Sequence, residues 1–271
     1  MTITDFLKKE SDQIQKKDLY LLMEYVLDMD KTTLLLNKEH HISDDKVAKL
    51  SNMIERHKGG EPIEYIINTG FFMGLEFYVD DHVLIPRADT ECLVELVVDY
   101  IKEQDKSPVD LIDMCTGSGC IAISLAKLTQ CRVTAVDISE DAIYIAKLNA
   151  QRNDTQVNFV VSDLFEQITH KVDIIVSNPP YISSHVIPTL EKNVKNYEPM
   201  LALDGGESGV EFYERLAISA KNHLNPAGVI FMEIGYDQGE RVRHLFEAAG
   251  YQNVVVKQDY SGTDRIVIAH V

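Results

Sequence analysis

The stretch that decides the fold is an apolar run, a turn with two glycines and a second apolar run: Leu111-Ile112-Asp113-Met114-Cys115-Thr116-Gly117-Ser118-Gly119-Cys120-Ile121-Ala122. The first run predicts a buried strand over 109–114, and the second predicts a helix over 119–129. Gly117 and Gly119 permit a tight turn and the close approach of a ligand to the backbone. Asp137 ends the next predicted strand, 20 residues after Gly117, where an acid commonly binds ribose hydroxyls.

From residue 90 onward, predicted helices and strands alternate. After a helix over 91–103, the strands are predicted at 109–114, 132–137, 157–161, 172–177, 227–234, 251–257 and 264–270. The other helices are predicted at 119–129, 140–151, 209–223 and 237–248. This alternation is typical of an α/β fold with a doubly wound, mostly parallel sheet, here of seven strands. The last two strands leave no room for a crossover helix, so we expect an antiparallel pair at one edge.

The region before residue 90 is predicted to contain a small helical domain over 1–62 and a β-hairpin linker over 63–89, ahead of the α/β domain over 90–271. Ser43 precedes an amphipathic stretch as a candidate helix cap, and Gly59-Gly60 is expected to end that helix. The hairpin is predicted from four β-rich runs, Ile66-Ile67, Phe71-Phe72, Phe77-Tyr78-Val79 and Val83-Leu84-Ile85.

Composition narrows the classes of function. The 271 residues carry 26 basic and 43 acidic side chains, a net charge of −17, which argues against a DNA-backbone footprint. No stretch is long and apolar enough to span a bilayer, and the first residues lack the order of a secretory signal, so a cytoplasmic protein is expected. The four cysteines and nine histidines show no zinc or other metal spacing, so the cysteines are expected to be reduced and no metal site is predicted.

A second motif, Asn178-Pro179-Pro180-Tyr181, follows the predicted strand over 172–177. The two prolines have no backbone N–H, so the strand must end there, and the carbonyls of Asn178 and Pro179 can face a cleft at its carboxyl end. Together with the Asn178 side chain, these acceptors suit a planar NH2 group, which they can hold while its lone pair points elsewhere.

The glycine turn does not fit the common phosphate-binding patterns. It does not end in the Gly-Lys-Ser/Thr of a phosphate-binding loop. It also has Cys115 where the dinucleotide pattern begins with glycine, and it lacks that pattern's last glycine. A dinucleotide ligand and a sharp strand-to-helix turn without a ligand stay open as alternatives, but a nucleoside that donates a transferable group explains the turn and the acceptor cluster better.

With both motifs placed, the chain resembles the class I S-adenosylmethionine-dependent methyltransferases, and more narrowly the PrmC/HemK family of protein-(glutamine-N5) methyltransferases. Along essentially the whole length, the resemblance is carried by the glycine turn and by the segments Gly60–Ile66, Leu84–Glu91, Asn178–Ile182, Glu198-Pro199 and Ala202–Gly206. It implies methylation of the glutamine in the Gly-Gly-Gln motif of peptide-chain release factors. It also implies S-adenosylmethionine as cofactor, S-adenosylhomocysteine as product, and a monomer that requires no metal.

The resemblance assigns roles to individual residues. It implies cofactor binding by Asp113, Cys115, Thr116, Gly117, Ser118, Gly119, Asp137, Asp163, Leu164 and Asn178. It implies catalytic roles for Asn178, Pro179, Pro180 and Tyr181, with the Tyr181 ring against the substrate amide, and substrate binding by Arg87, Thr90, Glu91, Asn178, Pro179 and Tyr181. The family usually has glycine at the position of Cys115, which would be strained if its φ is positive, and has proline and glutamate where this chain has Ala88 and Asp89.

Other interpretations stay open from the sequence alone. Asn178 can be a turn cap, Asp137 a helix N-terminal acid, Tyr181 a core aromatic, and Arg87 with Glu91 a surface ion pair at helical spacing. The chain can instead be an adenine-N6 methyltransferase of nucleic acid, because adenine also presents a planar NH2 group. It can also methylate a glutamine of a ribosomal protein, or be a binding module without catalytic activity.

Overall fold

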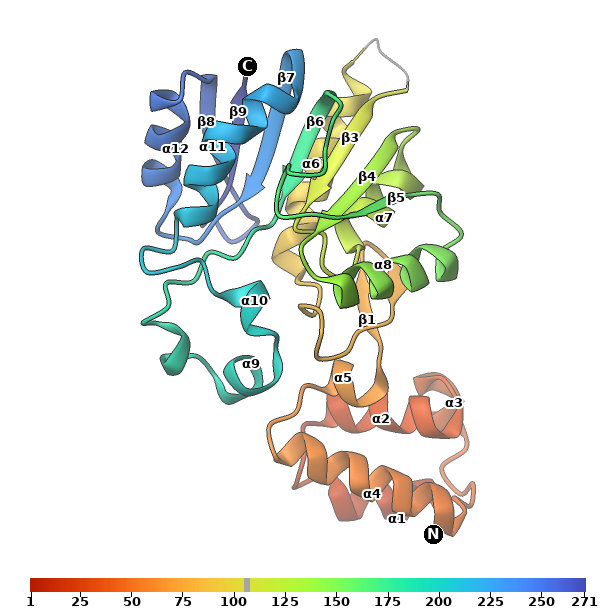
Figure 1. Ribbon diagram of the computed structural model, residues 1–271. Coiled ribbons are helices and arrows are strands. Elements are labelled where there is room, and N and C mark those ends of the chain that lie inside the picture. The colour runs from red at the N-terminus through yellow and green to blue at the C-terminus, as the bar shows by residue number, and fades with distance from the viewer. Residues whose placement is uncertain (105–107) are drawn as a thin grey trace. The chain divides into compact units, whose positions relative to one another are not determined.

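The computed structural model describes residues 1–104 and 108–271, which form two compact units (Figure 1). One unit comprises Met1–Thr69 with Lys192–Tyr197, and the other comprises Gly70–Glu191 with Glu198–Val271. Each unit has a buried apolar core of its own. The domain boundaries at 1–62, 63–89 and 90–271 stay a prediction. No helix within the described residues is long and apolar enough to cross a membrane.

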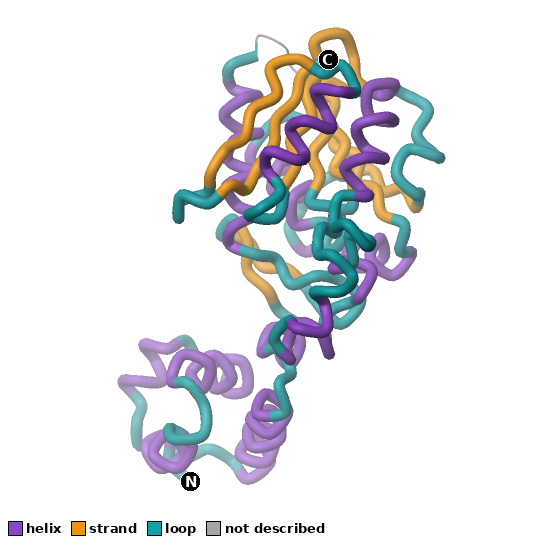
Figure 2. The backbone as a smooth tube through the Cα atoms, turned by 90° about the vertical axis from the view of Figure 1, so that its left-hand side faces the viewer, coloured by secondary structure: helices purple, strands orange, loops and turns teal. Residues whose placement is uncertain are grey.

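The named elements of the first unit are all helices, with one isolated β-bridge between Thr2 and His41. The helices are α1 Ile3–Glu10, α2 Lys16–Leu27, α3 Lys31–Leu36, α4 Asp44–Lys58, α5 Ile63–Ile67 and α9 Lys192–Tyr197 (Figures 1 and 2). Ser43 is the N-cap residue of α4 as predicted, but its side chain makes no capping hydrogen bond, and Gly59 ends the helix. The expectation of β structure at Ile66-Ile67 is wrong. Ile63, Ile66 and Ile67 lie at helical spacing and are all buried, so a helical turn buries these side chains together.

The hairpin is shorter than the sequence predicted. It consists of β1 Gly70–Phe72 and β2 Leu75–Phe77, paired antiparallel. The two turn residues, Met73 and Gly74, have φ angles of 50° and 72°, as a two-residue hairpin turn requires. The strand expected at Val83-Leu84-Ile85 is absent from this described segment, where Val83 and Ile85 are buried in a loop and Pro86 follows them.

The second unit is built on a seven-stranded sheet, which confirms the predicted fold class. The strands are β3 Asp110–Met114, β4 Arg132–Asp137, β5 Asn158–Val161, β6 Val172–Ser177, β7 Leu224–Glu233, β8 Gln252–Gln258 and β9 Asp264–His270. Their order is β5-β4-β3-β6-β7-β9-β8, and all pairs are parallel except those of β9 with β7 and β8. The predicted antiparallel edge pair is therefore confirmed.

Helices cover both faces of this sheet. The helices are α6 Ala88–Lys102, α7 Cys120–Leu128, α8 Glu140–Arg152, α10 Met200–Leu203, α11 Glu211–His223 and α12 Gly239–Ala248, with a 3-10 turn, η1, at Ile187–Thr189. Side chains alternate along β7: Phe231 contacts Tyr100 of α6, with ring centroids 5.4 Å apart, whereas Ile230 and Met232 join the core beneath α11 and α12. Accordingly, α6 and α11 lie on opposite faces of the sheet (Figure 1).

The strand order fixes where a ligand can bind. From β3 the chain moves outward to β4 and β5 and then returns to β6 on the other side of β3. Ligands of open α/β sheets bind at the carboxyl ends of the strands at such a reversal of order. Met114 and Ser177 are paired at those ends, and the Ser177 hydroxyl donates to the Met114 carbonyl at 2.8 Å. The glycine turn after β3 and the Asn178 motif after β6 are therefore neighbours.

Candidate active site

A cavity of about 300 Å³ lies where these two loops meet. Eleven of the residues singled out from the sequence line it: Arg87, Thr90, Cys115, Thr116, Gly117, Ser118, Asp137, Asp163, Leu164, Asn178 and Pro180. Five others, all in the described part of the chain, lie outside its lining: Glu91, Asp113, Gly119, Pro179 and Tyr181. The structure thus brings most of the predicted site together in one place.

The two glycines of the turn, Gly117 and Gly119, contribute to the site in different ways. Gly117 has a φ of 53° and lines the cavity, and a Cβ placed there would meet nothing within 4 Å. The backbone is therefore open to a ligand at Gly117. Gly119 has a φ of 81° and precedes α7, and a Cβ there would lie 3.0 Å from the Ala146 Cβ. Gly119 therefore permits close packing of α7 on α8 and acts on the site only through the turn.

Cys115 adopts the left-handed conformation, with a φ of 63°. A residue with a Cβ is disfavoured in this region by about 1–2 kcal/mol. Cys115 therefore has the positive φ that makes a residue with a Cβ strained at this position. Burial raises the pKa of its thiol, and all four cysteines are free thiols, as expected.

Asp113 lies beneath the turn and is fully buried. Its Oδ2 accepts hydrogen bonds from the Thr116 hydroxyl at 2.5 Å and from the Ala122 N–H at 3.1 Å. Its Oδ1 is buried and has no hydrogen-bond partner among the described residues. Burial raises the pKa of Asp113 to about 7. Asp113 therefore holds the turn from below and reaches the cavity only through Thr116.

Asp137 lies at the edge of the cavity. Its Oδ2 accepts from the Gly117 N–H at 2.8 Å and its Oδ1 from the Ser139 N–H at 3.0 Å. Burial raises the pKa of this carboxyl, while the two backbone N–H groups favour its ionised form. On the same side of the cavity, Asp163 accepts a hydrogen bond from Arg215 at 2.7 Å. The cavity therefore offers two carboxylates whose positions are fixed by other groups.

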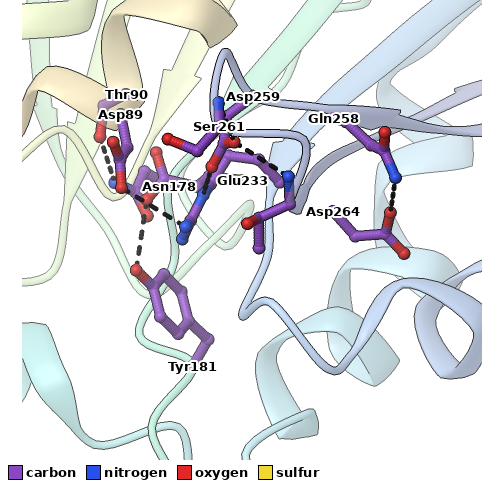
Figure 3. Close-up of polar contacts among 11 residues, drawn as sticks. Asp89, Thr90, Asn178, Tyr181, Glu233, Gln258, Asp259, Ser261 and Asp264 are labelled. Carbon is purple, nitrogen blue, oxygen red and sulfur yellow. Dashed lines mark hydrogen bonds and ion pairs between the residues drawn. The ribbon is translucent and has the colours of Figure 1, made fainter.

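Asn178 follows β6 and contacts α6. Its Nδ2 donates to the Thr90 hydroxyl oxygen at 3.3 Å (Figure 3). Of the two prolines after it, Pro180 lines the cavity. Tyr181 is not among the lining residues: its ring packs on the core, and its hydroxyl donates to Oε1 of Glu233 at 3.3 Å (Figure 3). The expected contact of this ring with the substrate amide stays a prediction.

Arg87 and Glu91 do not form the surface ion pair that their spacing allows. Arg87 bonds both carboxylate oxygens of Glu198, at 2.5 and 2.6 Å. Glu198 is only 6% exposed, so this is a half-buried pair at the cavity wall. Glu91 accepts from the Met73 N–H at 2.6 Å and so fixes the turn of the hairpin on α6.

Sequence reasoning missed two buried polar residues. Asn149 of α8 is fully buried and bonds the backbone N–H of Tyr78 at 2.6 Å, the Tyr78 carbonyl at 3.0 Å and the Ser118 carbonyl at 2.9 Å. Glu233 ends β7 and is 2% exposed. A signal for Glu233 was present, since it is a polar residue at the carboxyl end of an apolar strand, like Asp137 and Asn178.

One exposed cluster has the composition of a metal site: Asp80, Asp81 and His82. Its groups have partners within the cluster, because Asp80 accepts from the backbone N–H of His82 at 3.0 Å and contacts the imidazole at 3.0 Å. The hydrogen bond with Asp80 raises the pKa of His82. This cluster is therefore accounted for as a turn held by its own hydrogen bonds.

Comparison with known proteins agrees with this geometry. The sequence profile of the PrmC N-terminal domain matches residues 2–67, and that of the methyltransferase small domain matches residues 93–194. The release factor glutamine methyltransferase of Clostridium acetobutylicum is 40% identical over 269 residues, which cover 97% of this chain and 94% of the relative. The protein of the same name from Geobacter sulfurreducens is 37% identical over 248 residues, covering 91% of this chain and 86% of the relative.

Solved structures agree on the fold. A methyltransferase from Pyrococcus furiosus superposes with a TM-score of 0.54 at 17% identity and covers 84% of this chain and 98% of its own. A ribosomal protein L11 methylase from Lactobacillus delbrueckii subsp. bulgaricus superposes with a TM-score of 0.51 at 22% identity. The match covers 68% of this chain and 80% of the methylase. Because the relatives match along nearly the whole chain and both profiles are present, this protein belongs to the release factor glutamine methyltransferase family, within the class I S-adenosylmethionine-dependent methyltransferases.

Proposed function

We propose that this protein methylates the side-chain amide nitrogen of the glutamine in the Gly-Gly-Gln motif of a peptide-chain release factor. S-adenosylmethionine supplies the methyl group, and S-adenosylhomocysteine is the product. The observation that carries the proposal is the single cavity lined by both the glycine turn after β3 and the Asn178 motif after β6. A cofactor and an amide held by these two loops would meet at adjacent strand ends.

The cavity has features that fit the cofactor. The open backbone at Gly117 admits the close approach of a ligand, with Cys115, Thr116 and Ser118 beside it. The Asp137 carboxylate would accept hydrogen bonds from the ribose hydroxyls, and Asp163 and Leu164 would contact the adenine. When bound, the cofactor supplies an electrophilic methyl on a sulfonium, and the sulfur leaves as a neutral thioether.

The residues after β6 would orient the substrate. A carboxamide nitrogen is a poor nucleophile because its lone pair is delocalised. Acceptance of its two N–H bonds by the Asn178 side chain and the Pro179 carbonyl would direct the nitrogen toward the methyl group. These fixed dipoles would also stabilise the positive charge that develops on the nitrogen. The methylated nitrogen would then lose one of its two protons to solvent, which leaves the neutral N-methyl amide. Holding the nucleophile and the methyl group in line lowers the activation barrier by up to about 7–11 kcal/mol in well-oriented systems.

Other parts of the chain would present the release factor. Arg87 and Thr90 line the cavity beside Asn178, whereas Glu91 fixes the hairpin that precedes them. Residues 1–62 form the segment we assign to substrate recognition, with 63–89 as linker and 90–271 as the catalytic domain. The enzyme would act as a monomer on its substrate in the cytoplasm.

The competing substrates are less well supported. Adenine in nucleic acid presents the same planar NH2 group, but the net charge of −17 disfavours a polyphosphate partner. A ribosomal-protein glutamine fits the pocket chemistry equally well, but the relatives at about 40% identity bear the release factor name over nearly the whole chain.

The proposal is tested with purified release factors and S-adenosylmethionine carrying a labelled methyl group, followed by mass spectrometric mapping of the modified residue. We expect label on the Gly-Gly-Gln glutamine. Label on DNA, RNA or a ribosomal protein, with release factors unlabelled, would refute the assignment.

The Asn178→Ala variant tests the role of the amide acceptor. We expect kcat to fall by about 10²–10³-fold, as for loss of one preorganised polar contact to a transition state. Calorimetry should show cofactor affinity changed by less than about threefold, because the cofactor contacts lie mainly on the other loops. Asn158→Ala, at the start of β5 and away from the cavity lining, is the matched control. Equal loss of catalysis and cofactor binding would contradict the role.

A further inference from the structure

Glu233 is a buried carboxylate immediately behind the Asn178 motif. It ends β7, the strand next to β6, and it does not line the cavity described above. Its Oε1 accepts from the Tyr181 hydroxyl at 3.3 Å, and its Oε2 is buried and has no hydrogen-bond partner among the described residues (Figure 3). A buried carboxylate oxygen without a donor is costly, so a nearby hydroxyl should be directed at it.

Thr90 is the hydroxyl in question. Its side chain acts on the Glu233 carboxylate and lowers the pKa of that group, so Thr90 is the hydroxyl that can donate to the oxygen without a partner. The same oxygen accepts from Nδ2 of Asn178 at 3.3 Å. Thr90 is 2% exposed and belongs to α6, so it joins the end of β7 to the loop after β6. A threonine hydroxyl has one proton to donate and lone pairs to accept with.

We propose that Glu233 is a positioning residue that fixes the orientation of the Asn178 amide through Thr90. The inference rests on the function proposed above. An ionised carboxylate only accepts, so the Thr90 proton is directed to Glu233. The Thr90 oxygen is then left to accept, and Asn178 must present its NH2 group to it. Oδ1 of Asn178, the acceptor that the substrate amide needs, is thereby turned toward the cavity.

The surroundings of Glu233 bear on its charge. Burial and the carboxylate of Asp89 on α6 raise its pKa, whereas Thr90, Arg265 of β9 and Tyr181 lower it. Arg265 is itself held by Asp259 at 3.2 Å and by Asp89 at 3.4 Å. The backbone of Glu233 accepts from the Tyr213 hydroxyl of α11 at 2.8 Å. The pKa of Glu233 is raised overall because burial has the largest effect, and Arg265 with the hydroxyls of Thr90 and Tyr181 opposes that rise and favours the acceptor-only form that the orientation requires.

The first test compares Thr90→Val with Thr90→Ser. Valine keeps the shape and removes the hydroxyl, so kcat for release factor methylation should fall by at least about tenfold, or about 1.4 kcal/mol. KM for the release factor and the calorimetric affinity for S-adenosylmethionine should each change by less than about threefold. Serine restores the hydroxyl and should return kcat to within about threefold of the wild type.

The matched control is Thr134→Val on β4. Thr134 is also buried, and its hydroxyl oxygen also accepts from an asparagine Nδ2, that of Asn158 at 3.5 Å, but neither residue lines the cavity. This variant should keep the wild-type kcat. A Thr90→Val enzyme with wild-type kcat, or a Thr90→Ser enzyme as impaired as the valine variant, would overturn the inference.

The second test asks whether Glu233 acts through Thr90. Glu233→Met removes the acceptor and should lower kcat by about as much as Thr90→Val, whereas Glu233→Gln keeps an acceptor oxygen and should retain more activity. The kcat of the double variant Thr90→Val/Glu233→Met should lie within about threefold of that of the poorer single variant. Both substitutions break the same link from Glu233 through Thr90 to Asn178, so the second has nothing further to remove. Losses that multiply would show that the two residues act independently.

A measurement that needs no substrate, the exchange of the Asn178 side-chain NH2 protons with solvent, tests this inference independently of the proposed function. In ¹⁵N-labelled protein, the Asn178 side-chain NH2 signal is identified by its loss in Asn178→Asp. We expect slow exchange of this NH2 with solvent in the wild type and faster exchange in Thr90→Val. If that holds while release factors remain unmethylated, the proposed function fails and the inference stands. If release factors are methylated and exchange is the same in both proteins, the inference fails alone.

Discussion

Asp113 should make the stability of this protein depend on pH between about 4 and 7. The carboxyl is fully buried, and burial raises its pKa from 3.8 to about 7. A raised pKa means that the native state favours the protonated form. The stabilisation is therefore fully present below the unfolded-state pKa and is lost as the pH rises through the folded-state pKa.

The Asp113→Asn variant removes this dependence while keeping the contacts. An asparagine oxygen can accept from the Thr116 hydroxyl and the Ala122 N–H, as Oδ2 does. Between pH 5 and 7, one proton bound by the native state and not by the unfolded state corresponds to about 1.4 kcal/mol per pH unit. The wild type should thus lose about 3 kcal/mol of unfolding free energy relative to the variant between pH 5 and 8.

Urea unfolding at half-unit intervals from pH 4.5 to 8 measures this difference directly. Asp137 and Glu233 also have raised pKa values, but they are present in both proteins and cancel in the comparison. Asp99→Asn on the exposed side of α6 is the control, and its curve should run parallel to that of the wild type. Parallel curves for Asp113→Asn and wild type would refute the argument that burial governs this carboxyl.

Two further predictions concern the same loop. At position 115, where φ is 63°, Cys115→Gly should be more stable to heat than Cys115→Ala by about 0.5–1 kcal/mol, because relief of left-handed strain exceeds the extra flexibility of glycine in the unfolded chain. An alanine variant of equal or greater stability would contradict this. Asn149→Leu should lower the unfolding free energy by about 2–3 kcal/mol in urea, because it leaves the buried Tyr78 N–H and the Ser118 carbonyl without their partner. Loss of less than about 0.5 kcal/mol would mean that water replaces the amide there.

The sheet could be predicted closely because its strands are apolar runs that end at polar or turn residues. The predicted strands at 109–114, 132–137 and 172–177 match β3, β4 and β6 to within one residue. The error at Ile66-Ile67 has a physical cause. A short apolar run is compatible with either a strand or a buried helical turn, and only its packing in the helical core decides between them.

Those residues of the candidate site could be predicted whose neighbours are determined by their position in the fold alone. Asp137 ends one parallel strand and Asn178 follows another, so the topology alone brings them to the same edge of the sheet. The direction in which a side chain points does not follow from the topology. Tyr181 is turned toward Glu233, 52 residues further on, and Arg87 pairs with Glu198, 111 residues away. Partners at such separations leave no periodic signal in the sequence.

The strain at Cys115 indicates that the cofactor loop is shaped before any ligand arrives. A non-glycine residue keeps a φ of 63° only if the surrounding contacts hold it there. Those contacts are present on both sides: Thr116 and Ala122 bond to Asp113, and Gly117 bonds to Asp137. A hydrogen bond contributes a net stabilisation of about 0.5–1.5 kcal/mol, so the three together offset the cost of about 1–2 kcal/mol at Cys115. Asp113 and Asp137 therefore keep the turn in a binding-competent conformation, so less ordering remains to be done when the cofactor binds.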